Sequence, residues 1–346
     1  MATTDPTLAC QTLDLLRDSG ARFAVLHDAD SLSDGTLATD VDLAVEVPPG
    51  VLVTRLLPNL HARGLHPIVV WNYDVGGATT VVLATRDAAD GVQIDLICDA
   101  TGIGLDSVVA PALIDAATPD DRGWPRVKAV HELLYLLRKR QRKGDRPGLE
   151  PLLERARSLW SKEVEIEAFR ILSGRAARSV CRMVCEESVD LPAAPRRLVP
   201  HRRLARLGGR CVQPIGFWAQ LDSEHGAEEE ARAVAARFAR FLPVARFGSA
   251  PPGLIGDARW MLSHVAPVRW RAGLLVSWSR GHRHGTILRP DLRVRAIDVI
   301  DVSRRIVLAM ETRQLTHIRR YGRMSLSARR LSSSTSPRRS TAGSQS

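Results

Sequence analysis

The hydrophobic pattern of the first 120 residues alternates between two periods, and this alternation restricts the fold more than any other feature of the chain. Apolar residues recur at helical spacing over 7–18 and over 51–64, and Gly20 follows the first segment as a helix C-terminal glycine would. Five strands are expected from short apolar or alternating runs, at 23–26, 40–46, 67–71, 78–85 and 92–98. Helices and strands mixed in this order predict one α/β domain.

The pattern changes after this domain. From Pro125 to Leu172 apolar residues repeat at three and four residues, which indicates helices. A proline-rich stretch follows, then a strand-like run at 215–221 and a helix-like run at 231–241. The expected organisation is an α/β domain over 1–120, a helical segment over 121–190, a linker over 191–210, a second α/β domain over 211–321 and a disordered Arg/Ser tail over 322–346.

Composition excludes several classes of protein. Hydrophobic residues make up 45% of the 346, which excludes disorder of the whole chain. No run approaches the roughly 18 apolar residues of a transmembrane helix. The five cysteines are scattered and the N-terminus lacks a secretory pattern, so we expect a cytoplasmic protein.

Charge is divided unevenly along the chain. Residues 1–120 hold five basic and 17 acidic residues, although the whole chain carries a formal charge of +11. An acidic first part and a basic remainder suit a carboxylate metal site beside a surface that attracts phosphate. The alternative is that the basic excess reflects codon usage, because 45 of the 49 basic residues are arginine.

Three aspartates in the first domain carry the clearest chemical signal. Asp40 and Asp42 are two residues apart in an expected strand, so their side chains leave the same face. Two adjacent carboxylates repel each other, and Mg²⁺ between them would keep both ionised. Asp95, in another expected strand, would complete a site for metals that orient a triphosphate, and it is placed to deprotonate or orient an acceptor hydroxyl. An isolated Asp-x-Asp on an edge strand with a solvated face would look the same.

The segment Phe23-Ala-Val-Leu-His-Asp-Ala-Asp-Ser-Leu-Ser-Asp-Gly-Thr-Leu-Ala-Thr-Asp-Val-Asp-Leu-Ala-Val45 resembles the nucleotidyltransferase fold of the DNA polymerase beta superfamily. There, a Gly-Ser turn precedes a Ser-Asp-h-Asp-h strand (h, hydrophobic) by about a dozen residues, and a third strand-borne acid matches Asp95. The helix that begins at Val130 is similar to one in the members found in bacterial surface-polysaccharide loci. The resemblance covers residues 1–160.

The resemblance implies a Mg²⁺-dependent nucleotidyltransferase with a mixed sheet. Asp40, Asp42 and Asp95 would be the metal ligands, Asp95 would be catalytic, and His27 and Thr39 would lie at the nucleotide. The chain departs from the family at the Gly-Ser turn, where it has His27-Asp28-Ala29. A carboxylate there would repel phosphate.

In the relatives of this group, a thymidylate-kinase-like P-loop domain follows the first domain. Residues 216–231 match the strand, loop and helix of a P-loop, but Glu228, Glu229 and Glu230 stand where it has the second glycine, the lysine and the hydroxyl residue. No lysine follows Lys162. We therefore expect a degenerate P-loop that does not bind ATP, or an ordinary helix start.

The leading hypothesis is transfer of a nucleoside monophosphate from an NTP to a hydroxyl or phosphate acceptor, in surface-polysaccharide metabolism by the resemblance. The alternative is a non-catalytic pseudoenzyme that acts as a binding or scaffolding protein. Nucleic acid, bound through the basic second half, is a third and less favoured partner. Asp42→Asn is expected to abolish turnover and to leave the melting temperature unchanged or higher, because it relieves carboxylate repulsion.

Overall fold

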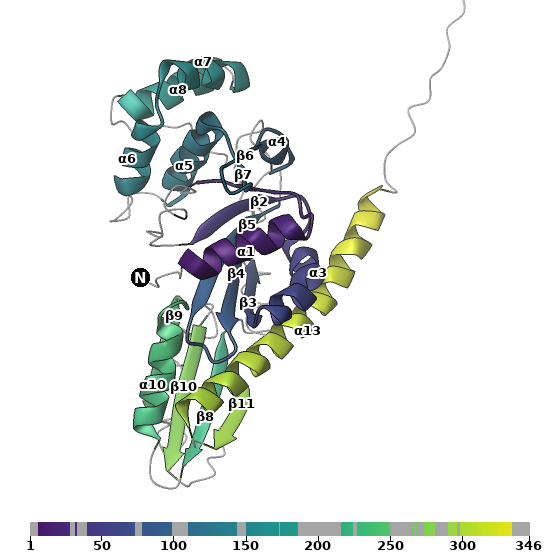
Figure 1. Cartoon of the computed structure of the whole chain (residues 1–346), viewed down its shortest axis with the longest axis vertical. Coiled ribbons are helices and arrows are strands. Elements are labelled where there is room, and N and C mark those ends of the chain that lie inside the picture. The colour runs from purple at the N-terminus through teal and green to yellow at the C-terminus, as the bar shows by residue number, and fades with distance from the viewer. Residues whose placement is uncertain are drawn as a thin grey trace, which may run out of the picture.

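The computed structural model describes most of the chain, and Figure 1 shows how its helices and strands are arranged. The described residues are 6–27, 32, 40–72, 78–98, 110–143, 150–172, 174–185, 216–223, 227–249, 265, 268, 273–280, 290–295 and 298–333. They form a mixed α/β structure with two sheets. Thr39, residues 28–30 and the expected linker at 191–210 lie outside the described residues.

The first sheet has seven strands in the order β3-β4-β5-β2-β1-β7-β6. β2 and β5 are parallel, as are β1 and β7, whereas the other neighbouring strands are antiparallel. The strands are β1 (Phe23–Val25), β2 (Val41–Val45), β3 (Leu65–Asn72), β4 (Ala78–Thr85), β5 (Gly91–Ile97), β6 (Thr118–Pro119) and β7 (Pro125–Arg126). Because β7 pairs with β1, the sheet continues past the boundary expected near residue 120.

Two amphipathic helices cover one face of this sheet. α1 (Pro6–Asp18) and α3 (Pro49–Ala62) bury leucines such as Leu13 and Leu56 in a cluster that also contains Val81 and Leu83 of β4. Alternate residues of a strand point to opposite faces, so Thr80, Val82 and Ala84 face away from these helices.

A helical segment packs on part of that second face. It consists of α5 (Ala129–Lys143), α6 (Glu150–Ser158), α7 (Lys162–Ile171) and α8 (Gly174–Cys185), and the short helix α4 (Ala110–Asp115) lies between β5 and β6 in the chain. The hydrophobic cluster of this helical segment includes Ala24 of β1 and Ala44 of β2 together with Leu133 and Leu137 of α5. α5 is therefore held over the β1–β2 end of the second face.

The second sheet has four strands in the order β11-β8-β10-β9, and every neighbouring pair is parallel. Its strands are β8 (Phe217–Ser223), β9 (Val244–Ser249), β10 (Gly273–Arg280) and β11 (Leu292–Arg295), with the helices α10 (Glu228–Ala239) and α13 (Val299–Ser333). The helix expected at 231–241 is thus α10, which begins at Glu228.

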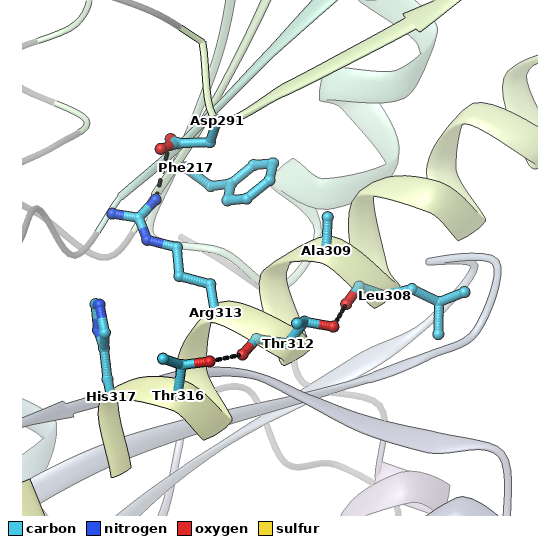
Figure 2. Close-up of a pocket in the computed structure, with 8 residues that line it drawn as sticks. All are labelled: Phe217, Asp291, Leu308, Ala309, Thr312, Arg313, Thr316 and His317. Atoms are coloured by element: carbon cyan, nitrogen blue, oxygen red, sulfur yellow. Dashed lines mark hydrogen bonds and ion pairs between the residues drawn. The ribbon is translucent and has the colours of Figure 1, made fainter. Parts of the chain in front are cut away.

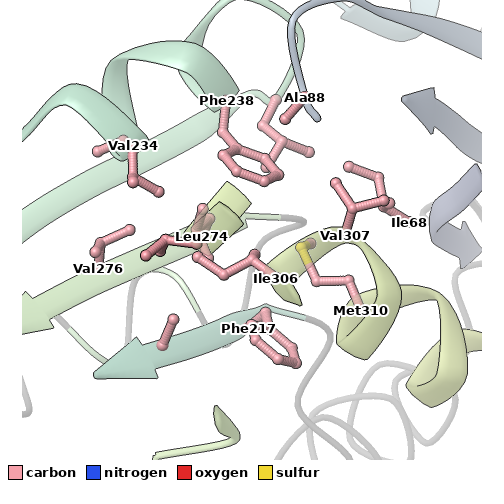
Figure 3. Packing of buried hydrophobic residues seen from close by; sticks show 14 of the residues in the cluster. Ile68, Ala88, Phe217, Val234, Phe238, Leu274, Val276, Ile306, Val307 and Met310 are labelled. Atoms are coloured by element: carbon pink, nitrogen blue, oxygen red, sulfur yellow. The ribbon is translucent and has the colours of Figure 1, made fainter. Parts of the chain in front are cut away.

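The first sheet shares one core with the second sheet and its helices, as Figure 3 shows. Phe238 of α10, Leu274 of β10 and Met310 of α13 pack with Ile68 of β3 and Val82 of β4. The second sheet with α10 and α13, called the C-terminal half below, therefore covers the β3–β4 end of the second face. The helical segment covers the opposite end. On β2 and β5 this face carries Ala44 and Ile97, which pack in the cluster of the helical segment, and, two residues earlier on each strand, Asp42 and Asp95.

The hairpin between β4 and β5 packs closely against Phe241, which follows α10. A Cβ atom at Gly91 would lie 2.5 Å from Cγ of Phe241, closer than packed side chains approach. We expect Gly91→Ala to lower the free energy of unfolding by about 1–3 kcal/mol, as overpacking does. Urea denaturation measures the change. The double variant Gly91→Ala/Phe241→Leu should recover part of it, and equal stability of the single variant and the wild type would contradict the packing described.

Two further sequence expectations concern the C-terminal tail and membrane-spanning helices. The disordered tail was expected from residue 322; α13 includes the first part of that segment up to Ser333, and residues 334–346 lie outside the described residues. Within the described part of the chain, no helix combines the length and apolar character needed to cross a bilayer.

Candidate active site

Register across three neighbouring strands aligns the polar side chains of the candidate site. Asp42 of β2 pairs with Asp95 of β5, and Asp95 pairs with Thr80 of β4. These residues lie together on the second face of the sheet, because cross-strand partners share a face. Asp40 directly precedes β2, two residues from Asp42, and extended backbone places it on the same side.

The structure brings together the three aspartates singled out in the sequence. One carboxylate oxygen from each of Asp40, Asp42 and Asp95 lies within 4.8 Å of the others. Asp42 and Asp95 are buried, with 1% and 4% of their surface exposed, whereas Asp40 is only partly buried. Three carboxylates this close cannot all remain ionised without a nearby cation.

Asp42 has two basic partners on one of its oxygens. Its Oδ2 contacts Nζ of Lys139, from α5, and Nε2 of His27, which follows β1. Lys139 Nζ and His27 Nε2 are 3.1 Å apart, and the imidazole stacks on the ring of Tyr135 at 5.6 Å between centroids. Burial alone would raise the pKa of Asp42, but the charge of Lys139 and the contact with His27 hold it well below its usual range.

Lys139 extends from α5, which packs on this face of the sheet, and contacts Asp42. Its side chain is only 12% exposed. Burial lowers the pKa of an ammonium group, but the charges of Asp42 and Asp40 outweigh burial and raise the pKa of Lys139 above its ordinary value. Lys139 therefore stays protonated.

Asp95 is shifted in the opposite direction from Asp42. Burial, the charges of Asp42 and Asp40 and a hydrogen bond with the Asp40 carboxyl raise the pKa of Asp95 to about 8, although Thr80 Oγ1 donates a hydrogen bond of 2.7 Å to Asp95 Oδ1 and opposes the shift. Without a further cation, Asp95 is mostly protonated at neutral pH. The site thus contains two neighbouring carboxyls with very different proton affinities, a pattern that is frequent at functional sites.

The second oxygen of Asp42 is a candidate ligand for a cation. Asp42 Oδ1 is buried and has no hydrogen-bond partner among the described residues. A buried carboxylate oxygen without a partner is costly, and a hard divalent cation is a suitable partner for it. The donor set, three converging carboxylates of which one has an unpartnered buried oxygen, therefore fits Mg²⁺.

The other site residues named from the sequence have different outcomes. His27 is buried against Asp42, with its Nε2 on that carboxylate. Thr39 lies outside the described residues. The sequence analysis did not single out Lys139, which stands in the basic run Arg138-Lys-Arg-Gln-Arg-Lys143; the available signal is that Lys139 is one of four lysines in a chain with 45 arginines.

The second sheet carries the segment compared with a P-loop. β8 ends at Ser223, α10 begins at Glu228, and the loop residues 224–226 lie outside the described residues. Glu228, Glu229 and Glu230 all lie in the first turn of α10. Their negative charge is favourable at the positive end of the helix dipole, but it opposes phosphate binding.

Figure 2 shows a pocket of about 530 Å³ beside α13, at the amino-terminal ends of β8 and β11. Ligands of parallel α/β sheets bind at the carboxyl ends, the opposite edge. Arg313, the basic residue of the pocket, is already paired with Asp291 at 3.0 Å. The pocket therefore adds no support for nucleotide binding by the second sheet, and no residue of the aspartate site lines it.

No protein-family model matches the chain. No curated protein matches it either.

Proposed function

We propose that this chain is a Mg²⁺-dependent nucleotidyltransferase that transfers a nucleoside monophosphate from an NTP to a hydroxyl or phosphate acceptor. The observation that carries the proposal is the convergence of the carboxylates of Asp40, Asp42 and Asp95, one of which, Asp42, has an unpartnered buried oxygen. Asp42 and Asp95 lie on the face of the first sheet against which α5 packs, and Lys139 of α5 contacts Asp42.

Mg²⁺, held by these three aspartates, would neutralise phosphate charge and align a triphosphate for in-line attack. The protein's own groups prepare the site. Lys139 and His27 occupy Oδ2 of Asp42 and leave Oδ1 for the cation. Thr80 fixes the carboxyl of Asp95 through Oδ1. Asp95, once ionised, would be placed to accept the proton of the attacking hydroxyl.

Calorimetry with Mg²⁺ and a panel of NTPs tests this function. Because the pKa of Asp95 is raised to about 8, this carboxyl holds a proton below that pH and must release it when the cation binds. Mg²⁺ affinity should therefore rise as pH increases from 6 to 9, and binding near pH 7 should release a proton into the buffer. Asp95→Asn should remove this pH dependence. Absence of metal-dependent NTP binding across this range would contradict the proposal.

A second candidate is a non-catalytic binding or scaffolding protein. The observation in its favour is the ion pair between Lys139 and Asp42, which already places a positive charge on the metal-ligand carboxylate. This alternative predicts no nucleotide affinity with or without Mg²⁺. The same calorimetric titration therefore separates the two candidates.

A further inference from the structure

A second cluster of titratable side chains lies where α13 crosses the edge of the first sheet. β3 is the edge strand, and α13 runs along it and along α3 (Figure 1). Met310 of α13 belongs to the core on one face of the sheet, whereas Ile318 packs with the cluster on the other face. The helix therefore passes from one face to the other, and Glu311 lies at the crossing.

Local backbone structure brings two histidines to this point. His61 is in the last turn of α3, and His66 is in β3. Gly64 connects the two elements with a φ of +70°, a left-handed conformation that favours glycine, and its N–H donates to the His61 carbonyl at 2.9 Å. This sharp reversal turns both imidazoles toward α13.

Three ligand atoms converge in the cluster. His61 Nε2 is 2.5 Å from Glu311 Oε1, and His66 Nδ1 is 2.9 Å from Glu311 Oε2. The two imidazole centroids are 5.1 Å apart. One ligand atom from each residue lies within 4.8 Å of the others, a spread that a small shift of the carboxylate converts into the shell of one ion with ligand distances near 2.1 Å.

Charge in the cluster is incompletely balanced. The side chain of Glu311 is 8% exposed, and among the described residues no lysine or arginine pairs with it. Burial would raise the pKa of Glu311, but the contacts with His66 and His61 outweigh burial and lower it, so the carboxylate stays ionised. One divalent cation could be bound by both imidazoles and the carboxylate together.

We propose that His61, His66 and Glu311 bind a divalent transition metal of the Zn²⁺ class, which fastens α13 to α3 and β3. Imidazole nitrogen combined with one carboxylate suits Zn²⁺ and disfavours Mg²⁺, which prefers oxygen ligands. The His61 side chain is 41% exposed, so the site opens to solvent on that side and water can complete the tetrahedral shell.

The position of the site gives it a structural role. Gln314, one helical turn after Glu311, accepts a hydrogen bond from the Val70 amide at 3.4 Å, and Ile318 lies against Gly50. The metal would add a further link to this row of contacts between α13 and the edge strand β3. This site takes a softer cation than the aspartate site and is independent of it.

The full chain, stripped of metal with a chelator, is titrated with Zn²⁺ by calorimetry and with Co²⁺ by visible absorption. We expect one equivalent bound by the cluster, a Co²⁺ band typical of nitrogen and oxygen ligands, and a higher melting temperature with Zn²⁺. His61→Gln, at an exposed position that folding should tolerate, is expected to weaken binding by at least about 10-fold, the lower range for losing even an outer partner of a ligand. Glu311→Gln should act in the same direction.

Two controls separate this site from other metal-binding groups. His317→Gln changes another histidine of α13 and should leave binding intact. Asp95→Asn should also leave the Co²⁺ band intact, because the aspartate site is separate. The proposal is overturned if the wild type binds no Zn²⁺, if His61→Gln binds it as tightly as the wild type, or if Asp95→Asn alone abolishes the band.

Discussion

Asp42→Asn is expected to reduce NTP turnover by more than about 100-fold, since losing even an outer partner of a metal ligand costs 10-fold to 100-fold. The amide removes one of three converging carboxylates and replaces the unpartnered Oδ1 with a neutral, weaker ligand. Turnover is measured with a panel of NTPs at saturating Mg²⁺. Persistence of turnover in a folded Asp42→Asn protein would exclude Asp42 as a ligand of the catalytic ion.

The structure changes the stability expected for the same variant. Sequence reasoning considered only repulsion between carboxylates and expected a melting temperature that was unchanged or higher. Asp42 is, however, the hydrogen-bond partner of two buried basic groups, Lys139 and His27. Removing its charge leaves both groups without this carboxylate, which should lower the free energy of unfolding by about 1–3 kcal/mol.

Activity must therefore be compared at a temperature where the variant is folded. Circular dichroism before and after the assay establishes this. Asp90→Asn is the matched control, because Asp90 is a partly buried aspartate of the same sheet region and pairs with Arg240 at 3.1 Å, away from the three carboxylates. Asp90→Asn should retain full turnover.

The sequence predicted the parts of the site that depend on local periodicity. Asp40 and Asp42 share a face because strand side chains alternate, and short alternating runs identified the strand that carries Asp95. The mixed α/β class followed from the order of helical and alternating patterns. These features depend on neighbouring residues alone, so one sequence is enough to predict them.

Contacts between distant segments could not be predicted in this way. Lys139 lies 97 residues from Asp42, and a run of basic residues at a helix end is usually solvated. The rarity of lysine marks Lys139 as unusual, but no local pattern connects it with Asp42. Glu311 lies 245 residues from His66, and Glu311 on its own matches an ordinary helical glutamate. The packing of Ile68 and Val82 against the C-terminal half could not be predicted from the sequence either, because an apolar strand residue is compatible with any hydrophobic core.

Lys139→Met removes the cation that neutralises Asp42 and keeps a side chain of similar length. We expect the free energy of unfolding to fall by about 3–5 kcal/mol without Mg²⁺, because breaking a buried ion pair leaves an uncompensated buried charge. The double variant Lys139→Met/Asp42→Asn should be more stable than Lys139→Met, since it removes the stranded carboxylate as well. Urea denaturation measures all of these proteins.

Mg²⁺ provides the link between this stability change and the proposed function. If the cation binds at Asp42, it replaces the charge that Lys139→Met removes, and millimolar Mg²⁺ should restore part of the lost stability through binding to the native state. The control is Lys128→Met, next to the start of the same helix, where the exposed pair with Glu167 at 3.6 Å should contribute less than about 1 kcal/mol. A Lys139→Met protein as unstable with Mg²⁺ as without it would place no cation at Asp42, because a bound ion beside that carboxylate must stabilise the fold.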